Sequence, residues 1–146
     1  MAMMNDVKEV LYTKEQLHEE VKKLGQQISR DYEGREPILV SVLKGAFIFM
    51  ADLVREVAIP CSLDIMAVSS YGSGTVTLGR VKIIKDLDTN IEGKDVIIVE
   101  DVLDSGVTLS HLIEMLKARN PASLAVCTLL DKPERRRAHV DVDYRG

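Results

Sequence analysis

Short runs of β-branched and other apolar residues alternate with helical patterns along this chain, and the alternation constrains its fold more than any other feature. Apolar runs predict strands at 38–43, 62–70, 81–84, 95–99 and 123–130. The intervening patterns predict helices at 13–30, 46–57 and 107–119. Strands separated by helices form largely parallel sheets that helices cover on both faces. The sequence therefore predicts an α/β fold of this kind.

Two of the predicted helices carry further local signals. Thr13 and Gln16 have the spacing of a capping box at the start of the first helix. Leu17, Val21, Leu24 and Ile28 then recur at helical spacing and predict one buried face. The segment 46–57 is apolar almost all round, which predicts a well-buried helix.

Length and composition limit the function classes that need to be considered. The chain has 146 residues, of which 46% are hydrophobic, so we expect one folded domain spanning 1–146. We find no signal-peptide pattern and no apolar run of membrane-spanning length, and we expect a cytoplasmic protein. Cys61 and Cys127 lack metal-ligand spacing, which favours reduced core residues over zinc ligands. The net charge of −4 argues against a dedicated nucleic-acid-binding protein.

Polar residues follow three of the predicted strands, at Lys44-Gly45, Glu100–Thr108 and Asp131-Lys132. Ligands of open α/β sheets bind at the carboxyl ends of the strands. We therefore expect these three clusters to form the functional site.

The cluster from Glu100 to Thr108 carries the most chemical information. The small residues that lead into the following helix expose backbone amides, and such a turn at a helix N-terminus binds phosphate. The carboxylates of Glu100 and Asp101 cannot serve a phosphate, but they suit a diol or a hydrated magnesium ion. Together these features indicate a site for ribose 5-phosphate. The alternative is an ordinary helix capped by Asp104 or Ser105, with solvated carboxylates.

The segment Val-Ile-Ile-Val-Glu-Asp-Val-Leu-Asp-Ser-Gly-Val-Thr-Leu at 96–109 resembles the signature of type I phosphoribosyltransferases. Three further segments, at 43–45, 70–72 and 130–136, make the chain most similar to the bacterial hypoxanthine (hypoxanthine-guanine) members of that family. The resemblance covers most of the chain. It implies the type I phosphoribosyltransferase fold, with a flexible active-site loop.

The resemblance also implies roles for individual residues. Glu100 and Asp101 would hold the ribose hydroxyls of phosphoribosyl pyrophosphate and order its Mg²⁺. Asp104 would be the catalytic residue that accepts a proton at N7 of the purine. The 5-phosphate would be held by Asp104, Ser105, Gly106, Val107 and Thr108.

Three more roles come from the other segments. Lys44 and Gly45 would bind pyrophosphate, Ser70 and Tyr71 would open the flexible loop, and Lys132 would donate to the 6-oxo group of the purine. Without the resemblance, Lys44 and Lys132 could be solvated lysines, and Tyr71 could belong to an ordinary surface loop.

The implied activity is purine salvage. Hypoxanthine or guanine would react with phosphoribosyl pyrophosphate to give IMP or GMP and pyrophosphate, in a homo-oligomer of two or four copies. One alternative is another base, such as xanthine, adenine or a pyrimidine, although a donor at Lys132 favours a 6-oxopurine. A second alternative is an RNA-binding regulator on the same fold, which the net charge disfavours and the basic residues 135–137 keep open.

The sequence departs from the family pattern at its end. Family members continue past the position of Gly146 into a segment that supplies a purine-stacking aromatic residue, backbone contacts to the base and an aspartate for a second magnesium ion. We expect that this C-terminal segment is missing from the chain as given, so that only part of the base-binding site is present.

Overall fold

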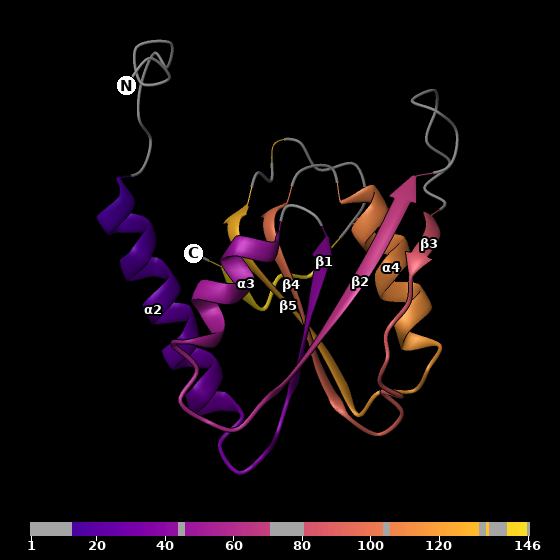
Figure 1. The fold of residues 1–146 in the computed structure, drawn as a ribbon, viewed down its shortest axis with the longest axis horizontal. Coiled ribbons are helices and arrows are strands. Elements are labelled where there is room, and N and C mark those ends of the chain that lie inside the picture. The colour runs from indigo at the N-terminus through magenta and orange to yellow at the C-terminus, as the bar shows by residue number, and fades with distance from the viewer. Residues whose placement is uncertain are drawn as a thin grey trace.

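The computed structural model describes residues 13–43, 46–70, 81–103, 106–131, 134 and 140–145. Within these residues the chain forms three helices and one sheet (Figure 1). The helices are α2 (Lys14–Asp31), α3 (Ala46–Val54) and α4 (Val107–Lys117). The strands are β1 (Ile38–Leu43), β2 (Ser62–Ser70), β3 (Val81–Lys85), β4 (Asp95–Leu103), β5 (Ser123–Asp131) and β6 (Tyr144–Arg145).

The six described strands are arranged in the order β3-β2-β1-β4-β5-β6. All neighbouring pairs are parallel except β2 and β3, which are antiparallel and have a register shift at Ala67 and Val68. The predicted largely parallel sheet is therefore confirmed.

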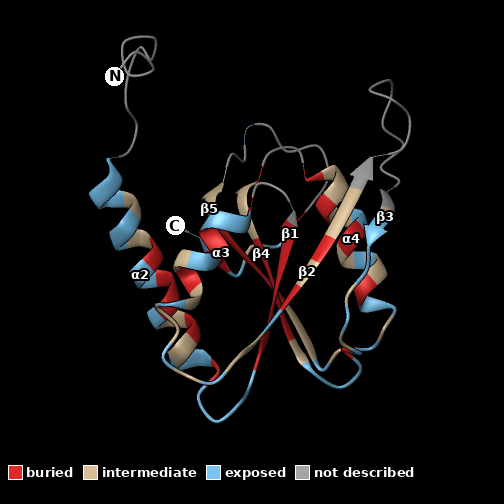
Figure 2. Cartoon of the chain, in the orientation of Figure 1, coloured by how far each residue is buried: buried red, intermediate tan, exposed pale blue. Residues whose placement is uncertain are grey.

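Helices cover both faces of this sheet, as predicted. In Figure 1, α2 and α3 lie on one side of the strands and α4 lies on the other. Side chains alternate across β4, so Ile97 and Val99 pack toward α2 and α3, whereas Val96 and Ile98 pack toward α4. The strands are consequently buried on both faces in the middle of the molecule (Figure 2).

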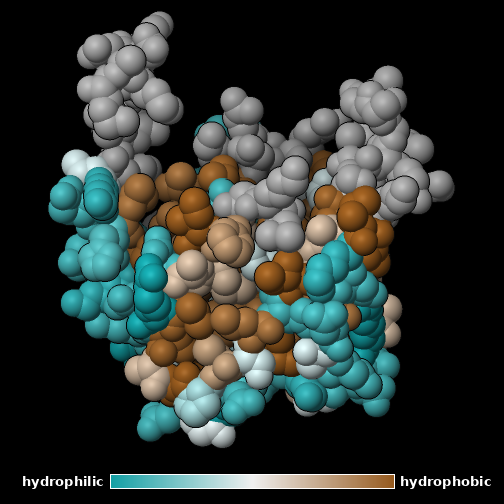
Figure 3. Space-filling view, in the orientation of Figure 1, coloured by the Kyte–Doolittle hydropathy of each residue, from teal (hydrophilic) through white to brown (hydrophobic). Residues whose placement is uncertain are grey.

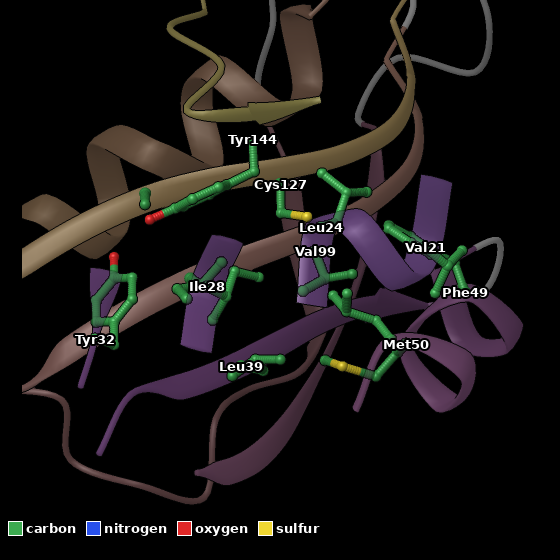
Figure 4. Packing of buried hydrophobic residues seen from close by; sticks show 13 residues of the cluster. Val21, Leu24, Ile28, Tyr32, Leu39, Phe49, Met50, Val99, Cys127 and Tyr144 are labelled. Carbon is green, nitrogen blue, oxygen red and sulfur yellow. The ribbon is translucent and has the colours of Figure 1, made fainter. Parts of the chain in front are cut away.

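The core on the α2 and α3 side is a cluster of buried side chains from two helices and four strands. Figure 4 shows how side chains from α2, α3 and β6 converge on the central strands; its labelled members include Leu24, Ile28, Phe49, Met50, Leu39, Val99, Cys127 and Tyr144. Cys127 is fully buried and Cys61 half-buried at the border of the cluster, and both are free thiols. This agrees with the prediction for the two cysteines.

Helix α2 begins as its sequence predicts. The Oγ1 of Thr13 accepts the N–H of Gln16 at 3.0 Å, and the Gln16 side chain accepts the N–H of Thr13 at 2.7 Å, so the capping box is complete. Val21, Leu24 and Ile28 are buried along one face, and Leu17 is half-buried near the start.

The prediction for the second helix was wrong in two respects. Helix α3 ends at Val54 rather than at 57, and it is not buried all round. Only one side of the helix, including Phe49, Met50 and Leu53, reaches the core. Phe47 and Ile48 point outward and are 56% and 72% exposed. Among the described residues, no helix is both long and apolar enough to cross a membrane.

Candidate functional site

The carboxyl ends of β1, β2, β4 and β5 meet at one edge of the sheet, at the top of Figure 1. The register pairs Leu43 with Ala67 and Leu103 with Asp131. Parallel pairing therefore brings the strand ends at which the three predicted clusters lie to the same edge of the sheet, as expected for an open α/β sheet.

Glu100 is a half-buried acid near this edge. It pairs with Thr128 of β5, and β-strand alternation directs its side chain to the α4 face, as for Val96 and Ile98. Burial raises the pKa of Glu100 to about 8, and the neighbouring Asp101 carboxylate adds to this rise. Without a cation, Glu100 is therefore mostly protonated at neutral pH.

Asp101 is half-buried beside it. Its Oδ1 accepts the backbone N–H of Val102 at 2.8 Å. This bond fixes the orientation of one carboxylate oxygen. The pairing of β4 with β5 keeps its register on both sides of Asp101, because Glu100 pairs with Thr128 and Val102 pairs with Leu130. The strand itself continues through Leu103, four residues beyond the predicted end at 99.

The donor set at this edge fits a magnesium ion that binds together with a substrate. Magnesium is usually held by one or two carboxylates, while waters and substrate phosphates complete its shell. Glu100 and Asp101 offer two carboxylates in sequence, and no cluster of three or more potential metal ligands occurs among the described residues. A cation would also favour the ionised form of Glu100, whose pKa is raised in its absence.

Helix α4 starts directly after these carboxylates, and its start differs from the sequence-based alternative. Its N-cap is Gly106, with a φ of 77°, and not Asp104 or Ser105. The Gly106 carbonyl accepts the N–H of Ser110 at 2.8 Å. Glycine tolerates this left-handed conformation, which other residues rarely adopt. The N-terminus of a helix that starts at a glycine is suited to the approach of an anion.

The structure also shows a contact at this edge that the sequence did not indicate. Asp131, at the end of β5, has a side chain only 8% exposed and forms an ion pair with Arg145 of β6 at 3.5 Å. The sequence places Asp131 beside Lys132 but does not indicate Arg145 as its partner. The two partners are fourteen positions apart and no local pattern connects them, because the pairing of β5 with β6 brings them together.

Several predicted site residues lie outside the part of the chain that the structure describes. They are Lys44, Gly45, Tyr71, Asp104, Ser105 and Lys132, together with the basic residues 135–137 and most of the expected flexible loop. Ser70 is described as the last residue of β2, through its backbone only. The roles assigned to these residues remain predictions.

Comparison with known proteins identifies the class to which this fold and site belong. The profile of the phosphoribosyl transferase domain family matches residues 9–146. The chain therefore belongs to the phosphoribosyltransferase family, as its motifs predicted.

The relatives narrow the resemblance to one group within that family. The hypoxanthine-guanine phosphoribosyltransferase of Streptococcus thermophilus is 50% identical over 139 residues, which cover 95% of this chain and 77% of the relative. The bifunctional protein TilS/HprT of Listeria monocytogenes is 48% identical over 145 residues. This chain spans 22% of that longer protein.

A solved structure confirms the fold. The crystal structure of a hypoxanthine phosphoribosyltransferase from Staphylococcus aureus matches with a TM-score of 0.95 and 46% identity. The match covers all of this chain and 79% of the other. The predicted type I phosphoribosyltransferase architecture is thus confirmed.

Proposed function

We propose that this chain catalyses the transfer of a phosphoribosyl group to hypoxanthine, guanine or both, yielding IMP or GMP and pyrophosphate, in purine salvage. The observation that carries the proposal is the succession of Glu100 and Asp101 at the end of β4 and the glycine at the start of α4, Gly106. It provides acceptors for two hydroxyls next to a site for one phosphate. The identity of about half of the residues with hypoxanthine-guanine phosphoribosyltransferases supports the choice of base.

In the proposed reaction, N9 of the purine forms a bond to the anomeric carbon of phosphoribosyl pyrophosphate, and the bond to the pyrophosphate oxygen breaks. Positive charge develops on the sugar, as in glycosyl transfer generally. Glu100 and Asp101 orient the ribose hydroxyls, and residues 104–108 hold the 5-phosphate. Asp104 accepts the proton that N7 releases. Mg²⁺, held by Glu100 and Asp101 with the substrate, would neutralise the leaving pyrophosphate.

The remaining predicted residues would complete the site. Lys44 and Gly45 bind the pyrophosphate, and Lys132 donates a hydrogen bond to the 6-oxo oxygen. The loop that begins at Ser70 and Tyr71 excludes water, which would otherwise react with the activated sugar. We further propose that residues 1–146 form one domain of a cytoplasmic homo-oligomer.

A panel of bases tests the proposed function. Purified protein is supplied with phosphoribosyl pyrophosphate, Mg²⁺ and one of hypoxanthine, guanine, xanthine, adenine or uracil, and pyrophosphate release is measured. We expect release with hypoxanthine, guanine or both, and its loss when EDTA removes the metal. Faster turnover with adenine or uracil would contradict the assignment.

A variant at the proposed base-binding lysine separates base recognition from sugar-phosphate binding. Replacing Lys132 with alanine leaves the 6-oxo group without its donor, which costs about 1–3 kcal/mol. We expect Lys132→Ala to raise the KM for the base about 5- to 150-fold and to change the KM for phosphoribosyl pyrophosphate much less. An unchanged KM for the base would show that Lys132 does not contact it.

A further inference from the structure

The ion pair of Arg145 with Asp131 has an unusually buried carboxylate. In the other ion pairs between described residues the carboxylate is more exposed. One example is Lys23 with Glu20, on the hydrophilic surface that α2 presents in Figure 3. The Asp131 side chain is only 8% exposed, whereas that of Arg145 is 58% exposed. Exposed pairs contribute little stability, but a buried carboxylate that loses its partner is costly.

The pair lies at the end of β5, at the edge of the sheet where the candidate site is. Asp131 is the last residue of β5 and is held on one side by its pairing with Leu103 of β4. On the other side β6 reaches only as far as Thr128, which pairs with Arg145. Residues 129–131 therefore have no strand on this side among the described residues. The Arg145 side chain extends beyond the end of the pairing instead, and its Nη1 lies 3.5 Å from the Asp131 Oδ2.

Strand β6 gives Arg145 a fixed base. The side chain of the preceding residue, Tyr144, is buried in the core (Figure 4), and its hydroxyl donates to the Asp31 Oδ2 at 2.8 Å. Asp143 is bound twice to Val126 of β5, since its N–H donates to the Val126 carbonyl at 3.0 Å and its Oδ2 accepts the Val126 N–H at 2.9 Å. The backbone before Arg145 is thus anchored to both α2 and β5.

We propose that Arg145 is a positioning residue for base recognition: it holds the Asp131 side chain from β6 and so fixes the end of β5 that Lys132 directly follows. The inference rests on the role of Lys132 in the function proposed above. A hydrogen bond weakens steeply when its donor is misplaced by about 1 Å, so the support beneath a binding residue matters for its affinity.

This contact should affect the base and not the sugar phosphate. Glu100 and Asp101, proposed for the ribose hydroxyls and Mg²⁺, belong to β4, and Gly106 starts α4. Arg145 acts instead on β5, the strand that precedes the proposed base-binding lysine. A residue that only stabilised the fold would have no reason to distinguish the two substrates.

Steady-state kinetics of charge-removing and charge-keeping variants test the proposal. We expect Arg145→Gln to raise the KM for hypoxanthine or guanine about three- to tenfold, with little change in the KM for phosphoribosyl pyrophosphate. Arg145→Lys keeps the charge and should raise the KM for the base less. Arg119→Gln is the matched control, because it removes the same charge and breaks the ion pair with Asp86 near the start of β4, at the far end of the sheet. It should leave both KM values unchanged.

A double-mutant cycle tests whether Arg145 acts through its neighbours. If it does, adding Arg145→Gln to Lys132→Ala or to Asp131→Asn should change the KM for the base by less than about twofold. Effects that multiply, an equal rise in both KM values, or an unchanged KM for the base in Arg145→Gln would overturn the positioning role and leave the proposed function standing. No turnover with any base, or an unchanged KM for the base in Lys132→Ala, would overturn both.

Discussion

Glu100, a residue of the candidate site, destabilises the folded state when it ionises. Its burial raises its pKa to about 8, so the folded chain retains a proton that the unfolded chain loses near pH 4.5. The folded state therefore binds more protons between these two pH values, and stability falls as the pH rises through that window. A bound cation would favour the ionised carboxylate of Glu100 and so offset this loss of stability. The raised pKa therefore agrees with a role of Glu100 in ligand binding.

Glu100→Gln removes the ionisable group while it keeps the shape of the side chain. We expect the variant without ligands to be about 1–3 kcal/mol more stable than the wild type at pH 8. The difference should shrink toward pH 5, where Glu100 is protonated in the folded wild type. Urea unfolding at both pH values measures it. A stability difference independent of pH would contradict the raised pKa.

Asp104→Asn addresses the residue proposed to accept the proton. Asparagine is nearly isosteric with aspartate but cannot act as a base. We expect turnover to fall by about 10²–10⁴-fold, with a smaller change in the KM for phosphoribosyl pyrophosphate. Steady-state kinetics with hypoxanthine and guanine check this. A fall of less than about threefold would lie far below the usual range for a general base and would contradict the role.

At the scale of elements, Gly25 determines how closely α2 approaches the chain after α3. A Cβ built on Gly25 would lie 2.5 Å from the Cβ of Glu56 and 2.6 Å from its carbonyl oxygen. Ser29 reinforces the contact, because its Oγ donates to the Gly25 carbonyl at 2.7 Å and accepts the N–H of Ala58 at 2.8 Å. The glycine is thus needed for a close approach between two segments.

Gly25→Ala reverses the usual effect of alanine in a helix. Alanine normally stabilises a helix interior by about 1 kcal/mol relative to glycine. Here the added methyl must push α2 away from backbone atoms, and overpacking of this kind costs about 1–3 kcal/mol. We expect a net loss of stability in urea unfolding. Gln26→Ala, at the exposed neighbouring position, should have little effect or stabilise slightly. A Gly25→Ala protein as stable as the wild type would contradict the close packing.

At the scale of the whole molecule, buried carboxylates connect segments that are far apart in sequence. Burial alone would raise the pKa of Asp64, but the N–H groups of Ile65, Thr89 and Asp88 outweigh it and hold the pKa below its usual value. At the opposite end of the sheet from the site, hydrogen bonds from Arg35, aided by Ser123, lower the pKa of Asp95. A lowered pKa contributes stability that is present near neutral pH and lost as the pH falls through the folded-state pKa.

Asp95→Asn should therefore make the stability of the molecule less sensitive to acid. The variant loses about 1 kcal/mol near pH 7, because the Arg35 contact weakens. We expect its Tm to fall less than that of the wild type between pH 6 and pH 3. Asp88→Asn is the control, since the Asp88 side chain is 84% exposed. Parallel Tm curves for Asp95→Asn and the wild type would contradict the prediction.

The local patterns in the sequence were sufficient for the three described helices and for β1 to β5, but β6 was not predicted. The capping box at Thr13 and the apolar runs of β1, β4 and β5 depend on neighbouring residues, so they can be recognised without the fold. The position of the candidate site could also be predicted from the sequence. The carboxyl ends of parallel strands meet at one edge of the sheet, and the signature at 96–109 is contiguous.

Only the tertiary structure decided features that depend on contacts between distant segments. The exposure of Phe47 and Ile48 follows from which side of α3 meets the sheet, since composition alone predicted burial all round. The ion pair of Asp131 with Arg145 and the close approach at Gly25 likewise arise from packing between elements. The raised pKa of Glu100 comes mainly from desolvation by burial, which depends on the folded surroundings of the side chain and cannot be read from the sequence.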